Sequence, residues 1–308
     1  MIKSLYWTDE IRFQGHPIFA FENEGNVYIW RYDLEYRGMQ NQCAGIPLDG
    51  KTISDHLDEY EARMSPTALD IHRKDVCISP GKYFPRIYRP GALEVNFQED
   101  GCPISDIKAI GQCLVAANII FAKLKSILEV VELNEQNLQV YGHEIRNLLL
   151  LSSMEFESVL SAILRENSYP SGRWNTTDYV KLCDPLHLSS YEVKFNLYPD
   201  FRPISPFLNW DFTRPTQSLA WYDAYNKTKH DRELNIGLST LEHALHSVAS
   251  IAVLLKVQFG ENHSFWHQGE LANINVSSNH DFTPEDYYVP FSLDKTLKTA
   301  WQKSCLQL

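Results

Sequence analysis

The chain has 308 residues, a formal net charge of −11 and a hydrophobic content of 44%. This apolar content, with 16 Tyr, 15 Phe and 7 Trp, supports sizeable buried cores and excludes a largely disordered protein. The acidic balance excludes a protein that coats nucleic acid through an extended basic face, but it leaves room for a small basic site on an acidic body.

Cysteine usage and the N-terminus indicate a cytoplasmic protein. The six cysteines form no Cys-x-x-Cys pair, so zinc-ribbon and thioredoxin-type motifs are absent from the sequence and reduced thiols are expected. Acids at Asp9 and Glu10 interrupt the N-terminus before any apolar core long enough for a signal peptide. The apolar stretch 111–127 includes Lys123 and Lys125, so we expect a buried amphipathic helix there and no membrane span.

Residues 1–102 are predicted to form a small β-rich region. Two aromatic and β-branched runs, 17–22 and 26–32, flank a short polar segment with a glycine, which is a hairpin signal. Ser54 is predicted to cap a short helix that ends near Arg63. The alternating segment 92–97 is typical of a further strand.

Residues 103–260 are predicted to form a four-helix bundle, because apolar residues now recur every three or four positions. The first two helices are expected over 104–131 and 138–166, and the third over 216–234. A capping box of Ser239 and Glu242 is expected to open the fourth helix, and Gly260 to end it. The C-terminal extension 261–308 is expected to hold a strand and a closing helix over 293–303. The predicted fold class is therefore α+β.

Residues 169–215 interrupt the bundle with a long insertion that is rich in proline and aromatic residues. Long non-helical connections inside a compact domain are uncommon and often functional. We expect the aromatics to pack onto the bundle. The insertion then either faces a partner or serves as a structural flap over a helix face.

The third predicted helix concentrates polar groups that can carry chemistry. Asn226 and His230 are spaced i and i+4, so they share one helix face, and Lys227, Lys229 and Arg232 add positive charge. An imidazole can take or give a proton during RNA cleavage, and an amide can hold a phosphate oxygen. The structural alternative is that a histidine near a helix C-terminus is favoured simply by the helix dipole.

The helix order and the run Tyr225-Asn226-Lys227-Thr228-Lys229-His230 resemble the HEPN superfamily, over roughly residues 103–260. Nucleases of that family carry Arg, a polar residue that is often Asn, three variable residues and then His. Asn226 and His230 match this spacing, whereas Tyr225 occupies the arginine position. A neutral tyrosine cannot supply the cation that balances the charge on a cleaved phosphate, so another residue has to provide it.

The second predicted helix holds the strongest substitute for that cation. Arg146 and His143 lie one turn apart near its start, beside Glu144. If the second and third helices pack antiparallel, Arg146 or His143 can face the Asn226 and His230 pair. The alternative is that Glu144 and Arg146 form a buried salt bridge that sets the helix register.

The resemblance implies an RNA-binding protein, and a metal-independent endoribonuclease of the toxin or antiviral-defence type. In that reading His230, Asn226 and Arg146 are catalytic. The substrate-binding residues are expected to be Tyr225, Lys227, Lys229, Arg232, His143 and Glu144. The alternative is a catalytically inactive HEPN-like module for dimerisation or for nucleotide or partner binding.

The expected partners are RNA, a second copy of the chain in a homodimer and a regulatory protein, with no membrane. No cofactor and no metal are expected. The pairs His243/His246 and His263/His267, the latter near Glu270, have metal-ligand spacing but lack a full ligand set.

Overall fold

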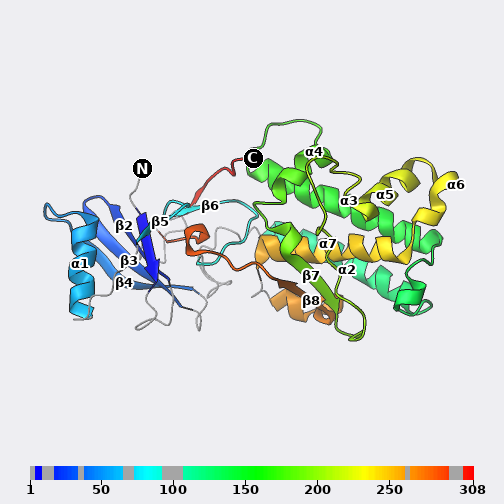
Figure 1. Cartoon of the computed structure of the whole chain (residues 1–308), viewed down its shortest axis with the longest axis horizontal. Helices are drawn as coiled ribbons and strands as arrows, with labels where there is room; N and C mark the ends of the chain where they lie inside the picture. Colours follow the sequence, from blue (N-terminus) through cyan, green and yellow to red (C-terminus); the bar gives the residue numbers. More distant parts are fainter. Residues whose placement is uncertain are drawn as a thin grey trace. The chain divides into compact units, whose positions relative to one another are not determined.

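The computed structural model describes residues 4–8, 17–33, 38–64, 73–91, 107–260, 264–290 and 301–308. Its fold is α+β, with an N-terminal five-stranded antiparallel sheet followed by a helical region, as the sequence predicts (Figure 1). The chain divides into two compact units. Unit 1 comprises Met1–Phe84, Arg89–Ser105 and Phe282–Ser304, and unit 2 comprises Pro85–Tyr88, Asp106–Asp281 and Cys305–Leu308.

The sheet of unit 1 has the strand order β4-β3-β2-β1-β5. The predicted hairpin is confirmed: β2 and β3 pair antiparallel, and Glu24 and Gly25 between them both have positive φ, as a two-residue turn of this kind requires. The strands are β1 (Ser4–Thr8), β2 (Pro17–Asn23), β3 (Asn26–Asp33), β4 (Gly38–Pro47) and β5 (Lys74–Asp75).

Alternation along these strands gives the sheet two buried faces. One face packs against α1 (Ile53–Met64), with Ile18 and Leu57 in a shared aliphatic cluster. The opposite face is aromatic, and Phe19 stacks on Tyr287 at a centroid distance of 5.8 Å. Unit 1 also contains β6 (Lys82–Tyr83), η7 (Pro284–Asp286) and β9 (Gln302–Lys303), and β6 pairs with β9.

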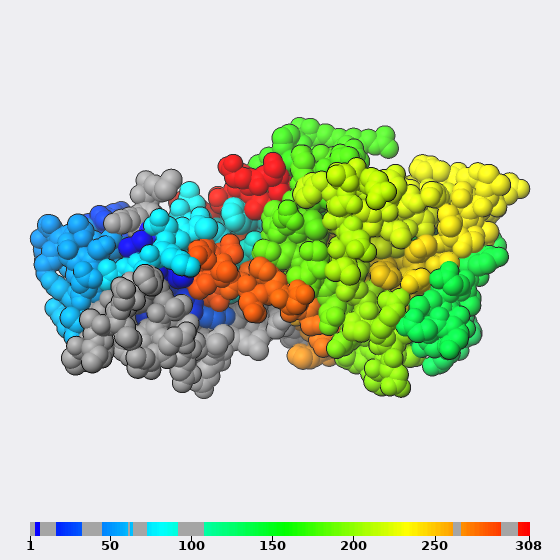
Figure 2. Space-filling model, in the orientation of Figure 1, coloured from blue at the N-terminus to red at the C-terminus, as the bar shows by residue number. Residues whose placement is uncertain are grey.

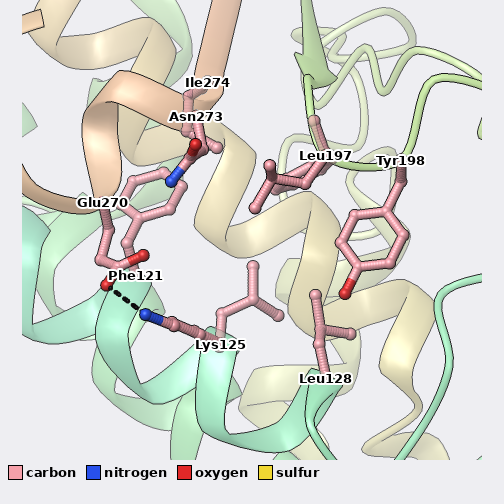
Figure 3. Close-up of a pocket in the computed structure, with 10 residues that line it drawn as sticks. Phe121, Lys125, Leu128, Leu197, Tyr198, Glu270, Asn273 and Ile274 are labelled. Carbon is pink, nitrogen blue, oxygen red and sulfur yellow. Dashed lines mark hydrogen bonds and ion pairs between the residues drawn. The ribbon is translucent and has the colours of Figure 1, made fainter. Parts of the chain in front are cut away.

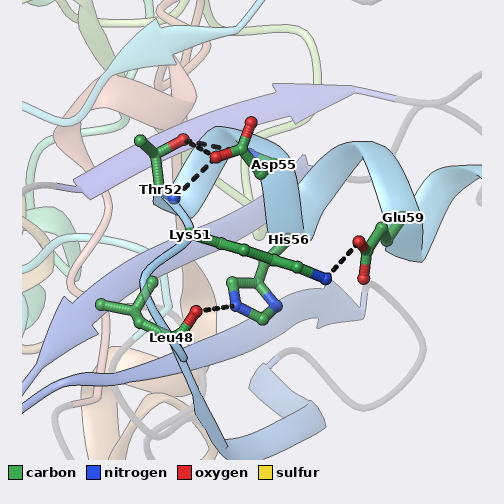
Figure 4. Close-up of polar contacts among 6 residues, drawn as sticks. All are labelled: Leu48, Lys51, Thr52, Asp55, His56 and Glu59. Atoms are coloured by element: carbon green, nitrogen blue, oxygen red, sulfur yellow. Dashed lines mark hydrogen bonds and ion pairs between the residues drawn. The ribbon is translucent and has the colours of Figure 1, made fainter.

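Helix α1 begins with a cap two residues earlier than predicted (Figure 4). Asp55 donates its backbone N–H to Thr52 Oγ1 at 3.2 Å, and the Asp55 carboxylate accepts the Thr52 N–H at 2.7 Å. The expectation that Ser54 is the cap is therefore wrong, because Ser54 already lies inside the helix. Beside the cap, Lys51 forms an ion pair with Glu59. The predicted strand at 92–97 lies outside the described residues.

Unit 2 is built around a bundle of α2 (Ile107–Leu128), α3 (His143–Glu166), α5 (Ala220–His230) and α7 (Leu241–Phe259). The predicted four helices are confirmed in order, but with shorter bounds. The capping prediction for the fourth helix is wrong by one residue, because Thr240 Oγ1 accepts the His243 N–H at 3.2 Å. Gly260 ends α7 with φ +76, as expected.

Of the predicted closing helix 293–303, residues 293–300 lie outside the described residues and Gln302–Lys303 form a strand of unit 1.

The remaining elements of unit 2 are short. The short elements are η1 (Glu135–Asn137), α4 (Thr176–Tyr179), η2 (Val180–Leu182), η3 (Leu188–Ser190), β7 (Tyr191–Phe195), α6 (Arg232–Asn235), η4 (Ile236–Leu238), η5 (Ser264–His267), η6 (Gly269–Asn273) and β8 (Ile274–Ser278).

The insertion is an integral part of the core of unit 2. It forms a large part of the face of unit 2 seen in Figure 2, in green and yellow-green. Its aromatics reach Phe156 of α3, with centroid distances of 6.0 Å to Phe207 and 5.8 Å to Trp210. The expectation that these aromatics pack onto the bundle is confirmed. Strand β7 of the insertion also pairs with β8, the strand expected after residue 261.

Small polar residues allow α3 and α7 to approach closely. Ser152 Oγ and Ser247 Oγ are 2.7 Å apart, and Ser153 Oγ lies 3.1 Å from the same Ser247 oxygen.

By length and composition alone, α2 and α3 could each cross a membrane, which the expectation for 111–127 had excluded. Both helices contribute buried residues to the bundle, which requires the same apolar character.

Candidate functional site

The polar segment of the third helix lies at the C-terminal end of α5. The helix buries one face, which includes Tyr222, Tyr225 and Thr228, and exposes Lys229 and His230. The helix ends at His230, so the prediction of one helix over 216–234 is wrong. A break follows because the Asp231 side chain accepts the Leu234 N–H at 3.1 Å and caps the short helix α6.

Asn226 and His230 occupy the same face, one turn apart, as their spacing predicts. His230 is exposed to solvent, and Asn226 is half-buried. One amide hydrogen of Asn226 is already used, because Nδ2 donates to the Tyr222 carbonyl oxygen at 3.1 Å. The imidazole is therefore accessible to a ligand, while the amide is oriented by its own helix.

Tyr225, the residue before Asn226, is fully buried. Its hydroxyl accepts a hydrogen bond from Lys229 Nζ at 2.9 Å, and the same ammonium lies 4.9 Å from the ring centroid. Burial raises the pKa of Tyr225, and the hydrogen bond from Lys229 opposes that rise. The phenol is neutral near pH 7, and its hydroxyl contacts an exposed residue, Lys229.

A carboxylate of α3 lies behind this pair. Glu157 accepts a hydrogen bond from the Tyr222 hydroxyl at 2.6 Å, and the Tyr222 and Tyr225 rings are 5.4 Å apart. Burial, with this bond to Glu157, raises the pKa of Tyr222. The hydrogen bond to Tyr225 raises the pKa of Lys229, so the ammonium keeps its proton.

Sequence reasoning missed two residues of this cluster. Glu157 belongs to no motif, and nothing in the sequence distinguishes it from Glu155 on the other side of Phe156. Arg173, from the insertion, is close enough to Lys229 for its positive charge to oppose the rise in the pKa of Lys229. Nothing in the sequence pointed to Arg173, because the insertion has no periodic pattern that would place it.

Arg146 lies beside α5, as the antiparallel arrangement of the helices predicts, but it contacts backbone. Its Nη2 donates to the Thr228 carbonyl oxygen at 2.9 Å, in the last turn of α5. That carbonyl oxygen would otherwise lack a hydrogen-bond donor, because Thr228 is within four residues of the helix end. Arg146 thus stabilises the C-terminal turn that carries His230.

The other residues near the start of α3 are exposed. Glu144 pairs with Lys123 of α2 at 3.2 Å, so the alternative of a buried salt bridge between Glu144 and Arg146 is wrong. His143 is the first residue of α3 and is exposed. On α5, Lys227 is neutralised by Asp223, one turn earlier, at 2.6 Å.

The pocket in Figure 3 lies elsewhere in unit 2 and contains none of the predicted site residues. It has a volume of about 100 Å³ and a mainly apolar lining. An ion pair between Lys125 and Glu270, 3.1 Å apart, lies at one side. The pocket is lined by Phe121, Leu124, Lys125, Leu128, Phe195, Leu197, Tyr198, Glu270, Asn273 and Ile274.

The histidine pairs with metal-ligand spacing are not joined by further ligands within the described ranges, where no group of three or more His, Cys, Asp or Glu could hold a metal. His243 contacts the Leu238 carbonyl oxygen at 2.7 Å. Burial lowers the pKa of His246 to about 4. His263 lies outside the described residues.

Comparisons with family models, with curated proteins and with solved structures found no match for this chain. The site consists of an exposed imidazole, a helix-bound amide and the exposed ammonium of Lys229 at the end of α5.

Proposed function

We propose that this chain is an HEPN-like RNA-binding protein that contacts the phosphodiester backbone with the C-terminal end of α5. The carrying observation is the exposure of His230 beside the exposed Lys229, one turn from Asn226, on a protein whose formal net charge is −11. An exposed lysine that is ion-paired to no acid in the described part of the chain suits a confined anionic contact rather than a coating of nucleic acid.

The same groups support metal-independent cleavage of the bound RNA. His230 acts as general acid or base, taking the 2′-hydroxyl proton or protonating the leaving 5′-oxygen. The Asn226 amide orients a phosphate oxygen, and nearby cations balance the charge that develops on phosphorus. Arg146 supports this arrangement by holding the last turn of α5 through Thr228.

The test is an RNA cleavage assay with total tRNA and mRNA, run without added metal and with chelator present. Wild-type protein is expected to leave 2′,3′-cyclic phosphate ends, and His230→Ala to lose them. His267→Ala, an exposed histidine of η5, serves as the matched control and is expected to behave as wild type. If wild type and His230→Ala leave the same fragment pattern, the nuclease proposal is wrong.

The alternative is an inactive HEPN-like module, favoured by a specific observation: Tyr225 is buried where the family has arginine, and Arg146 is bonded to a carbonyl oxygen. This alternative predicts no cleavage under the same conditions. Absence of retardation of labelled RNA at low salt, where phosphate contacts are strongest, contradicts RNA binding and favours a module for dimerisation or partner binding.

The proposal includes a cytoplasmic location and a homodimer, with a regulatory protein as a further partner. Sedimentation of the purified chain over a range of concentrations tests the dimer. A single species of monomer mass at all concentrations contradicts it.

A further inference from the structure

The cations around His230 differ in how firmly they are held and in whether their charge is cancelled. Lys227 is neutralised by Asp223 at 2.6 Å. Arg146 is half-buried and bonded to the Thr228 carbonyl oxygen. Arg232 is exposed on α6 and has no ion-pair partner among the described residues, so nothing fixes its guanidinium.

Lys229 alone among these four is exposed, held and left charged, because Arg146 keeps its charge but is half-buried against a backbone carbonyl oxygen. Its ammonium donates to the neutral hydroxyl of Tyr225 at 2.9 Å and lies 4.9 Å from the ring centroid. The partner is a phenol, so the bond restricts the side chain without cancelling its charge. Glu157, the nearby carboxylate, attracts this ammonium through its charge but forms no ion pair with it within the described ranges, and accepts a hydrogen bond from Tyr222.

Tyr225 is suited to this positioning because the packing around it restricts its side chain. The residue is fully buried, and its ring packs 5.4 Å from that of Tyr222, whose hydroxyl is bonded to Glu157 of α3. The flexible lysine is therefore anchored to the core through a rigid side chain. A cation that is ordered before the ligand arrives loses less conformational entropy on binding.

We infer that Lys229 is the phosphate-binding cation of this site and that Tyr225 is its positioning residue. Together they take the place of the single arginine in the family motif. The inference rests on the proposed RNA binding and names the group that meets the phosphate. Burial of Tyr225 excludes direct contact between its side chain and RNA.

The first experiment measures the affinity of a single-stranded RNA oligonucleotide as a function of salt concentration. Lys229→Gln is expected to lower the affinity about tenfold at low salt. It should also reduce the slope of log affinity against log salt by about 0.7, the value for one lost phosphate contact. Lys227→Gln is the matched control and should change both quantities much less. Equal effects of the two variants overturn the inference.

The second experiment is a double-mutant cycle with Tyr225→Phe, which keeps the buried ring and removes the hydroxyl. Tyr225→Phe is expected to weaken binding about threefold in the wild-type background, with an unchanged salt slope, because the ammonium stays but is less ordered. In the Lys229→Gln background it should have no further effect. An equal loss in both backgrounds marks a merely structural role for Tyr225 and overturns the positioning claim.

A third measurement needs no RNA and separates failure of this inference from failure of the proposed function. Acylation of lysines by an amine-specific reagent, followed by mass spectrometry, should label Lys229 faster in Tyr225→Phe than in wild type, with Lys227 unchanged. Equal labelling of Lys229 in both proteins overturns the positioning even if RNA binds. Faster labelling of Lys229 in Tyr225→Phe, together with no RNA binding by the wild-type protein, supports the positioning by Tyr225 but contradicts the phosphate role of Lys229.

Discussion

Arg146 and Tyr225 show how single side chains acquire roles that their motif positions do not specify. Arg146, which was expected to face the substrate, supports a helix end, and Tyr225, which was expected to contact the substrate, lies in the core. Both outcomes follow from the need to satisfy buried polar groups: a terminal carbonyl oxygen of α5 needs a donor, and a buried phenol needs a partner.

Arg146→Met is expected to lower the free energy of unfolding by about 1–3 kcal/mol, because the bond from a charged donor to the Thr228 carbonyl oxygen is lost. Chemical denaturation followed by circular dichroism measures the change. Arg232→Met, at an exposed position without an ion-pair partner among the described residues, is the control and should be nearly neutral. Unchanged stability of Arg146→Met contradicts the assignment of Arg146 to the support of α5.

Gly260→Ala is expected to destabilise the protein by about 2–4 kcal/mol. Gly260 has φ +76, and an added Cβ would lie 2.5 Å from Cε2 of Tyr88, too close for any carbon contact. Gly237→Ala, where an added Cβ meets no atom within 4 Å, is the control and should leave stability almost unchanged. The comparison is made from the denaturation midpoints, and similar midpoints for the two variants contradict the prediction.

At the scale of elements, the ends of helices decide where functional groups lie. α5 stops at His230 because Asp231 caps α6, so His230 and Arg232 belong to different helices. Near its start α7 also carries a titratable histidine, His246, which lies near Glu242, His243 and Arg202. Arg202 of the insertion bonds Glu242 at 2.9 Å and ties the insertion to this end of α7.

His246 is expected to make stability fall in acid. Burial lowers its folded-state pKa from 6.5 to about 4, so the unfolded chain binds the proton more readily. Stability should decline as pH drops from about 6.5 towards 4, by at most about 3 kcal/mol from this residue.

The test compares the pH dependence of the unfolding free energy in wild type and His246→Gln. The variant should show a shallower decline across this window, since its side chain takes up no proton. Parallel curves for the two proteins contradict the assignment of this decline to His246.

At the scale of the whole molecule, each unit has its own apolar cluster. Phe21 is fully buried in the aromatic face of the unit 1 sheet, and Phe156 is fully buried in the bundle of unit 2. Domains with separate cores can unfold in separate steps, so a single unfolding transition is not expected for this chain.

Denaturant unfolding is therefore expected to occur in two transitions, each sensitive to one of these phenylalanines. Phe21→Ala should shift one transition and Phe156→Ala the other, each by about 3–5 kcal/mol. Far-UV circular dichroism reports mainly on the helices of unit 2, and tryptophan fluorescence reports on both units. If both substitutions move one common transition by the same amount, the two units are not independent.

Local patterns were sufficient to predict the main elements of this protein. The three- and four-residue apolar period predicted the main helices, the polar turn between residues 22 and 26 predicted the hairpin, and Gly260 predicted the end of α7. These features depend on neighbours within a few positions, so they can be read from the chain itself. Helix starts were misplaced because Thr and Ser are both good caps, and at α1 and α7 a threonine caps the helix in place of the nearby serine that was predicted.

The contacts between helices at the candidate site were decided only by the tertiary structure. Spacing of i and i+4 places Asn226 beside His230, and Tyr225 beside Lys229, on α5. No local pattern predicts the burial of Tyr225, or joins Arg146 to the Thr228 carbonyl oxygen or Tyr222 to Glu157. Which polar atoms meet depends on how α3 and α5 pack and on which groups that packing removes from water. Partners for those groups come from whichever residues, near or far in the chain, lie within about 3 Å.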